Sequence, residues 1–98
     1  MSNAVRVVIS GRVQGVGYRA WVEHHAIELG LQGWVRNRRD GSVEAVLEGE
    51  ASIVANMVAF CRRGPASARV DHVAEEAAST DTLGLRRAGE GFSVLPTI

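Results

Sequence analysis

The sequence contains no lysine, so all eleven of its basic residues are arginines. This absence excludes Schiff-base catalysis and a lysine clamp on a phosphate group. Cys61 is the single cysteine, and no disulfide can therefore form within the chain. A protein with one unpaired thiol is typical of a reducing compartment, so we expect a cytoplasmic protein.

Long hydrophobic runs, net charge and aromatic residues are scarce as well. No apolar run approaches the roughly 20 residues that a membrane span needs, and no signal peptide is recognisable at the start. The formal net charge of zero argues against a general nucleic-acid-binding protein. An aromatic content of 5% is too low for a sheet face that stacks RNA bases. We therefore expect neither a nucleic-acid nor a membrane partner.

What the chain does have is the composition of one small globular domain. Its 98 residues are 46% hydrophobic, enough to bury a single modest core. We expect one domain over residues 1–98, with residues 1–4 as an N-terminal tail outside the fold. Charge is uneven, because residues 1–40 carry a net charge of +3 and residues 41–98 a net charge of −3. The positive half would suit a site for a small anion.

Two glycines in that positive half, Gly15 and Gly17, stand between an apolar β-branched run and a segment of helical periodicity. Glycine there allows a positive φ and a close backbone approach to a ligand. Successive N–H groups in such a turn can form an anion nest at a helix start. Arg19 follows directly, and its planar guanidinium suits bidentate capture of phosphate or carboxylate. The same residues also suit an ordinary strand-to-helix connection, and the pattern alone leaves both interpretations open.

Hydrophobic periodicity predicts the order strand, helix, strand, strand, helix, strand, with a short final strand. The predicted strands span residues 5–12, 33–38, 42–48, 69–75 and about 92–96. The first helix spans about 19–30, where Tyr18, Val22, Ala26 and Leu29 repeat at helical spacing. The second helix carries Ile53, Met57, Phe60 and Cys61 and stops at Gly64. Residues 49–50 are expected to break a strand, and residues 77–91 to form a loop. This order predicts the α+β, ferredoxin-like split β-α-β plan (βαββαβ), an antiparallel sheet with two helices on one face.

In that plan a residue late in the second strand lies across the third strand from the glycine turn. Asn37 is such a residue, and its amide offers one acceptor and two donors, enough to hold and aim a water molecule. A turn-forming role for Asn37, just before Asp40-Gly41, remains the alternative from the residues alone.

Other reactive side chains offer weaker hypotheses. His24 and His25 are adjacent on a predicted helix and point about 100° apart, so they do not form a metal-binding pair. We expect no metal site, with packing or surface roles for His72, Cys61, Trp21, Trp34 and Phe60. Three arginines of the predicted hairpin, Arg36, Arg38 and Arg39, are either solvated charges or weakly steer an anion.

Three stretches together resemble the acylphosphatase family: residues 11–19 (GRVQGVGYR), 33–37 (GWVRN) and 40–44 (DGSVE). The resemblance extends from about Val5 to about Val94. It implies an enzyme that hydrolyses a carboxyl–phosphate anhydride to a carboxylate and inorganic phosphate, without a cofactor or metal. By this resemblance, the phosphate-binding residues are Gln14, Gly15, Val16, Gly17, Tyr18 and Arg19. Arg19 and Asn37 would be the catalytic residues, with Asn37 orienting the attacking water.

The resemblance also implies which molecules the protein binds. The substrate would be a small acyl phosphate, with inorganic phosphate or sulfate as competing anions, and the protein is expected to be a monomer. Tyr18 stands where the family usually has phenylalanine, and its hydroxyl needs a partner if it is buried. A non-catalytic anion-binding or accessory module on the same fold is the main alternative, because a fold alone does not determine function.

Overall fold

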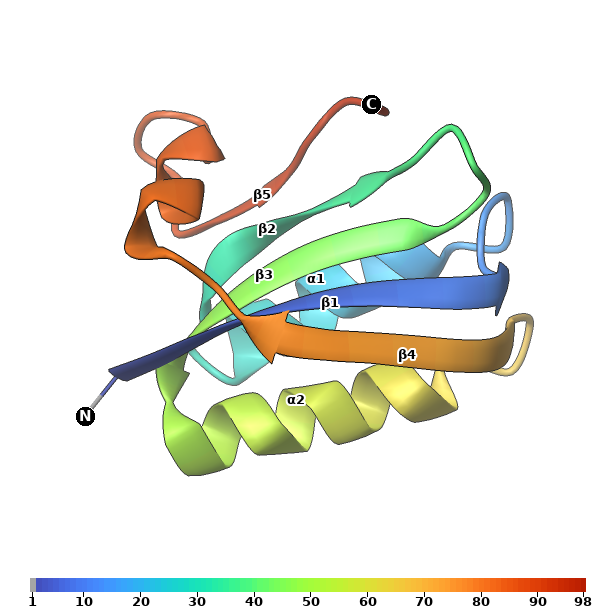
Figure 1. Cartoon of the computed structure of the whole chain (residues 1–98), viewed down its shortest axis with the longest axis horizontal. Helices are drawn as coiled ribbons and strands as arrows, with labels where there is room; N and C mark the ends of the chain where they lie inside the picture. Colours follow the sequence, from blue (N-terminus) through green and yellow to red (C-terminus); the bar gives the residue numbers. More distant parts are fainter. Residues whose placement is uncertain (1) are drawn as a thin grey trace.

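The computed structural model describes residues 2–98, and these form one layer of strands and one layer of helices (Figure 1). The strands are β1 (Ser2–Arg12), β2 (Gln32–Asn37), β3 (Val43–Glu50), β4 (Arg69–Ala77) and β5 (Phe92–Val94). The helices are α1 (Tyr18–Glu28), α2 (Ala51–Arg63) and the short 3-10 helix η1 (Thr80–Leu85). No helix within the described range is long and apolar enough to cross a bilayer.

The strands lie in the order β4-β1-β3-β2-β5. The β1, β2 and β3 arrangement is the split β-α-β unit, because β3 pairs antiparallel to both β1 and β2 and lies between them. The predicted fold class is therefore confirmed. One detail differs, since β5 pairs parallel to β2 and makes the sheet mixed rather than wholly antiparallel.

Both helices pack on the same face of the sheet, where the main core lies (Figure 1). The helical spacing predicted for the first helix is confirmed, because Tyr18, Val22 and Ala26 are its buried residues. In α2 the buried residues are Val54, Met57, Val58 and Cys61. The predicted Met57 and Cys61 are among them, whereas Ile53 and Phe60 are only half-buried against the core.

The opposite face of the sheet is partly covered by residues after β4. The side chain of Trp34 is buried there with Val46 and Leu95, and Leu83 of η1 packs against this cluster. The Trp34 Nε1–H donates a hydrogen bond of 2.7 Å to the Thr82 carbonyl oxygen. The expectation of an unstructured loop over residues 77–91 was therefore wrong for Thr80–Leu85, because a buried indole holds this segment in a 3-10 helix.

Four strand boundaries also differ from the predicted ones by two residues or more, and one of them is the end of β4, which runs to Ala77. The strand β1 begins at Ser2, and Asn3 and Ala4 pair with Gly49 and Glu48, so residues 2–4 are not a tail. Met1, assigned to the same tail, lies outside the described residues. The strand β3 runs through Gly49 to Glu50 and passes directly into α2, so residues 49–50 do not break it. At the other end, β5 stops at Val94, before Pro96, and lies at an edge of the sheet.

A β-bulge explains why β4 has a poor alternating pattern in the sequence. Ser10 of β1 pairs with His72, but the next residue, Gly11, pairs with Val70, so Asp71 is an extra residue in β4. The bulge changes the parity of the strand. Val70 and Val73 can therefore both pack against the main core although they are three residues apart.

Candidate active site

The turn between β1 and α1 requires glycine for its backbone conformation. Gly15 has a φ of 73° and Gly17 a φ of 81°, and both values lie in the left-handed region. A Cβ atom added at either glycine would meet no atom within 4 Å. Backbone conformation, and not crowding, is therefore the reason for glycine, and the space in front of the turn is open.

The helix that follows begins without a side-chain cap. Gly17 is the N-cap residue, and it has no side chain to accept a hydrogen bond from the first turn. The Gly17 oxygen accepts the first bond of the helix, from the Trp21 N–H at 3.1 Å. The N–H groups of the first turn, at the positive end of the helix dipole, are therefore available to an anion.

Arg19 stands in this first turn, half-buried. Its guanidinium forms no ion pair and no hydrogen bond with any described residue, in contrast to Arg6, Arg36 and Arg38. It lines a pocket of about 470 Å³ beside the glycine turn. The lining residues of this pocket are Gly15, Gly17, Tyr18, Arg19, Ala20, Glu23 and Val94. An uncommitted arginine beside free amides is an anion-binding arrangement.

Asn37, the last residue of β2, is placed by the register of three strands. It lies opposite Val43 of β3, and Val43 lies opposite Ile9 of β1. Its side chain shares a face with that of Val35, which is buried in the main core beneath the helices. Asn37 therefore lies on the helix side of the sheet, in line with Val43 and Ile9, near the end of β1 that leads into the glycine turn.

The Asn37 side chain also carries an unusual feature. Its Oδ1 atom is buried and has no hydrogen-bond partner among the described residues. Buried polar atoms are nearly always partnered, and an exception calls for an explanation. An acceptor held ready for a water molecule or ligand proton is one such explanation.

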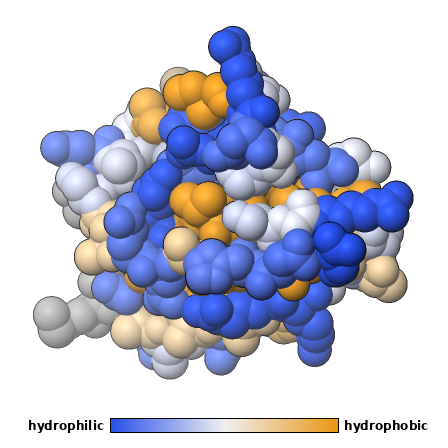
Figure 2. Space-filling model, turned by 45° about the vertical axis from the view of Figure 1, so that its right-hand side comes forward, coloured by the Kyte–Doolittle hydropathy of each residue, from blue (hydrophilic) through white to orange (hydrophobic). Residues whose placement is uncertain are grey.

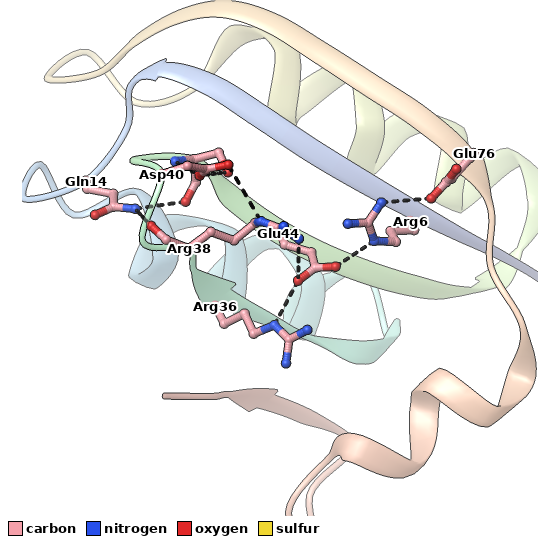
Figure 3. Close-up of polar contacts among 8 residues, drawn as sticks. Arg6, Gln14, Arg36, Arg38, Asp40, Glu44 and Glu76 are labelled. Atoms are coloured by element: carbon pink, nitrogen blue, oxygen red, sulfur yellow. Dashed lines mark hydrogen bonds and ion pairs between the residues drawn. The ribbon is translucent and has the colours of Figure 1, made fainter. Parts of the chain in front are cut away.

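Gln14 connects the glycine turn to the β2–β3 hairpin (Figure 3). Its Nε2 atom donates to the carbonyl oxygen of Arg38 at 2.7 Å and to that of Ser42 at 2.8 Å. The Arg38 N–H donates to the same Ser42 oxygen at 2.8 Å. Both donor hydrogens of the Gln14 amide are therefore used by the hairpin, and this side chain is not free to bind a phosphate group.

The remaining predicted loop residue, Val16, is half-buried and packs against the main core. Its carbonyl oxygen accepts a hydrogen bond of 2.8 Å from the Ser67 Oγ–H. The side chains of Gln14 and Val16 thus attach the turn to the hairpin and to the main core. The other four predicted residues line one pocket: Gly15, Gly17, Tyr18 and Arg19.

Two of the three hairpin arginines are bound to a buried carboxylate on the other face of the sheet (Figure 3). The Oε1 atom of Glu44 lies 2.8 Å from the Nε of Arg36 and 3.6 Å from the Nη1 of Arg38. Arg6 binds the second oxygen of the same carboxylate. Burial raises the pKa of Glu44, but the hydrogen bonds from Arg36 and Arg6 outweigh it and keep this pKa below its ordinary value. Arg36 and Arg38 are therefore poor candidates for steering an anion to the pocket.

The Tyr18 hydroxyl is directed into the core. It donates a hydrogen bond of 2.7 Å to the Cys61 carbonyl oxygen, and burial raises the pKa of Tyr18 above its ordinary value. Burial also raises the pKa of the Cys61 thiol to about 12. The hydroxyl that distinguishes Tyr18 from phenylalanine thus has its partner in α2, and Cys61 is an unreactive core residue.

The histidines form no shared site. His24 pairs with Glu28 at 2.8 Å, whereas His25 stacks on the Phe60 ring at a centroid distance of 4.7 Å. His72 is exposed on β4. The described part of the chain contains no group of three or more metal-binding side chains.

Three residues of the pocket were not predicted: Ala20, Glu23 and Val94. The helical spacing of four residues between Arg19 and Glu23 is a signal that could have identified Glu23. No comparable signal exists for Val94, because its place beside α1 depends on the parallel pairing of β5 with β2.

A family model, curated relatives and a solved structure carry the same family name. A family model described as acylphosphatase matches residues 5–92. A curated acylphosphatase from Bradyrhizobium diazoefficiens is 66% identical, and one from Rhodopseudomonas palustris is 62% identical, each over 100% of both chains. The solved structure of an acylphosphatase from Coxiella burnetii superposes with a TM-score of 0.83 at 33% identity, covering 96% of this chain and 93% of that chain.

Proposed function

Since the chain belongs to the acylphosphatase family, it is a hydrolase of acyl phosphates, and we propose which of its residues perform the reaction. In this proposal the backbone of residues 14–18 and the Arg19 guanidinium hold the phosphate group. Asn37 orients the water that attacks phosphorus. The products are a carboxylate and inorganic phosphate.

The phosphate site rests on the free donors at the start of α1. The N–H groups of the first turn lack a side-chain cap, and Arg19 has no partner among the described residues. Such fixed donors stabilise the charge on the equatorial phosphate oxygens without reorganising during the reaction. Because the side-chain amide of Gln14 donates both of its hydrogens to the hairpin, Gln14 would contribute to phosphate binding through its backbone alone.

The water-orienting role of Asn37 is supported by its buried, unpartnered Oδ1 atom, the single observation on which the catalytic proposal depends most. An amide oxygen can accept a hydrogen bond from a water molecule and so aim the water oxygen at phosphorus. As the water attacks, one of its protons would pass to a phosphate oxygen of the substrate, because neither Arg19 nor an amide oxygen is a base strong enough to accept it.

The chemistry requires little else from the protein. The leaving group is a carboxylate whose conjugate acid has a pKa of about 4, so it departs without a general acid. Phosphoryl transfer of this kind needs positioning and charge stabilisation rather than covalent catalysis. The proposed mechanism therefore uses no metal and no cofactor. We also propose a monomer in the cytoplasm, where the buried thiol of Cys61 would stay reduced.

Release of inorganic phosphate from acetyl phosphate tests this assignment against the alternative of a non-catalytic anion-binding module. Purified protein should accelerate the release, and Arg19→Ala should remove the acceleration. Binding of phosphate without any turnover of acetyl phosphate would instead support the binding module.

A further inference from the structure

The pocket beside the glycine turn continues past the phosphate site along α1. Arg19 and Glu23 both line it and are four residues apart, one helical turn along the same face. Their Cα atoms are thus separated by about 6 Å along the helix axis. Beyond Arg19, the wall of the pocket is formed by Ala20, Glu23 and Val94.

The direction of attack assigns this second part of the pocket to the acyl group. In phosphoryl transfer the attacking and leaving oxygens are roughly in line with phosphorus. If Asn37 holds the water, the leaving carboxylate lies on the side of the phosphate away from Asn37. Asn37 is not part of the pocket lining, whereas Ala20, Glu23 and Val94 are. The acyl group would therefore lie against Ala20 and Glu23 of α1, because Val94 pairs with Val35, only two residues from Asn37 in β2.

Glu23 contributes the only carboxylate to this lining. It is half-buried, and it forms no ion pair or hydrogen bond with any residue that the structure describes, Arg19 included. The nearest acidic neighbour in the helix, Glu28, is by contrast exposed and paired with His24. The negative charge of Glu23 is thus neither neutralised by a partner nor fully immersed in water.

We propose that Glu23 selects acyl phosphates whose acyl group is neutral or cationic, and rejects those whose acyl group carries a second anion. The inference rests on the proposed function, because it assumes that the phosphate is bound at Arg19. An anionic acyl substituent would lie a few ångströms from the Glu23 carboxylate in a partly desolvated pocket. Repulsion between like charges at that distance lowers kcat/KM by about five- to tenfold.

Rigid benzoyl phosphates with different para substituents test the selection without intramolecular cyclisation of the substrate. We would measure kcat/KM for benzoyl phosphate, 4-carboxybenzoyl phosphate and 4-(aminomethyl)benzoyl phosphate. The wild-type protein should hydrolyse the carboxy compound least efficiently of the three. Glu23→Gln should raise the ratio of kcat/KM for the carboxy compound to that for benzoyl phosphate by about fivefold, and Glu23→Lys should invert the preference.

Glu28→Gln is the matched control, because it removes a carboxylate from the same helix outside the pocket, and it should leave the ratio unchanged. The preference should also weaken between about 0.02 M and about 0.5 M salt, since the charges are partly exposed and screened. Identical ratios in wild type, Glu23→Gln and Glu23→Lys would overturn the role of Glu23. Failure of the wild-type protein to hydrolyse benzoyl phosphate at all would instead overturn the proposed function.

Discussion

The Gln14 side-chain amide donates a hydrogen bond of 2.7 Å to the carbonyl oxygen of Arg38, the residue directly after Asn37. A second bond from the same nitrogen reaches Ser42 on the other side of the hairpin. The glycine turn and the end of β2, 24 residues apart along the chain, are thereby held in one position relative to each other. The distance between the proposed phosphate site and the proposed water site depends on this connection.

Replacing Gln14 should therefore separate phosphate binding from turnover. In Gln14→Met the two bonds are lost but the backbone of the turn is retained, so phosphate affinity should change less than threefold. Turnover should fall by about tenfold or more, because a displacement of about 1 Å at a reacting centre is enough to cost that much. Kinetics with acetyl phosphate and phosphate binding by calorimetry would measure the two effects.

Gln32→Met is the matched control for Gln14→Met. Gln32 is exposed at the far end of β2, and its amide oxygen also makes a tertiary contact by accepting a hydrogen bond from Arg86. Its replacement should leave kcat unchanged. An equal loss of phosphate affinity and kcat in Gln14→Met would show that Gln14 only supports the shape of the turn.

Arg19 and Asn37 should differ in what they contribute. Arg19→Ala removes a contact to phosphate in both ground and transition states, so phosphate affinity and kcat should fall together. Asn37→Ala should reduce kcat by ~10²–10³, or roughly 3–4 kcal/mol, while phosphate still binds, because the water is lost but the donors remain. Near-UV circular dichroism would confirm that both variants fold. Retention of more than about a tenth of the wild-type kcat in Asn37→Ala would rule out the water-orienting role.

Gly15→Val should abolish activity with a modest loss of stability. A β-branched residue is disfavoured at a φ of 73°, which costs about 1–3 kcal/mol or displaces the N–H groups of the turn. Gly91→Val is the control, since Gly91 has no positive φ and an added Cβ meets nothing there either. Full activity of a folded Gly15→Val variant would show that the turn only connects β1 to α1 and does not bind phosphate.

Inorganic phosphate and sulfate should inhibit competitively against acetyl phosphate. The free amides and Arg19 recognise a tetrahedral anion, which both ions supply. Sulfate should raise the apparent KM without changing kcat, and Arg19→Ala should bind sulfate much more weakly. Inhibition that lowers kcat at constant KM would place the anion site elsewhere.

The buried carboxylate of Glu44 should make stability depend on pH. Its folded-state pKa lies below its ordinary value, so the unfolded state binds the proton more readily. The stabilisation is thus complete above the ordinary pKa of the carboxyl group and is lost as the pH falls through the folded-state value. Glu44→Gln should lower the free energy of unfolding at pH 7 by about 1–3 kcal/mol, because Arg6 and Arg36 lose their partner.

Urea unfolding of Glu44→Gln and wild type at several pH values would measure this dependence. The difference in stability between the two should narrow as the solution becomes acidic, because wild-type Glu44 is then protonated as well. Glu48→Gln, on the same strand but without an ion pair among the described residues, should show no such trend. A difference in the free energy of unfolding that stays constant across the pH range would indicate that the Glu44 charge does not stabilise the fold.

Much of the fold follows from local patterns in the sequence. The glycines at 15 and 17 mark a strand-to-helix turn because only glycine adopts a positive φ without cost, and both have it. The helical spacing of Tyr18, Val22 and Ala26 predicts the buried face of α1, which is observed. Asp40-Gly41 predicts the hairpin that sets Asn37 opposite Val43. The proposed roles of Arg19 and Asn37 rest on the family resemblance and remain predictions.

Other features depend on contacts between distant segments, which no local pattern contains. The bulge at Asp71 arises from pairing with β1, and η1 owes its shape to the burial of Trp34. The wall of the pocket beside the glycine turn joins Glu23 of α1 to Val94 of β5, 71 residues apart by their positions in the sequence.

The family, the order of most elements and the position of the glycine turn can be predicted from the amino-acid sequence alone. The last two depend on neighbouring residues and their backbone preferences, and the family depends on the short motifs themselves. Three side-chain contacts depend instead on the tertiary structure: Gln14 binds the hairpin, Glu44 pairs with Arg36, and Glu23 lines the pocket beside the glycine turn. Side-chain partners are chosen by distance and geometry in space, and a residue type alone permits many of them.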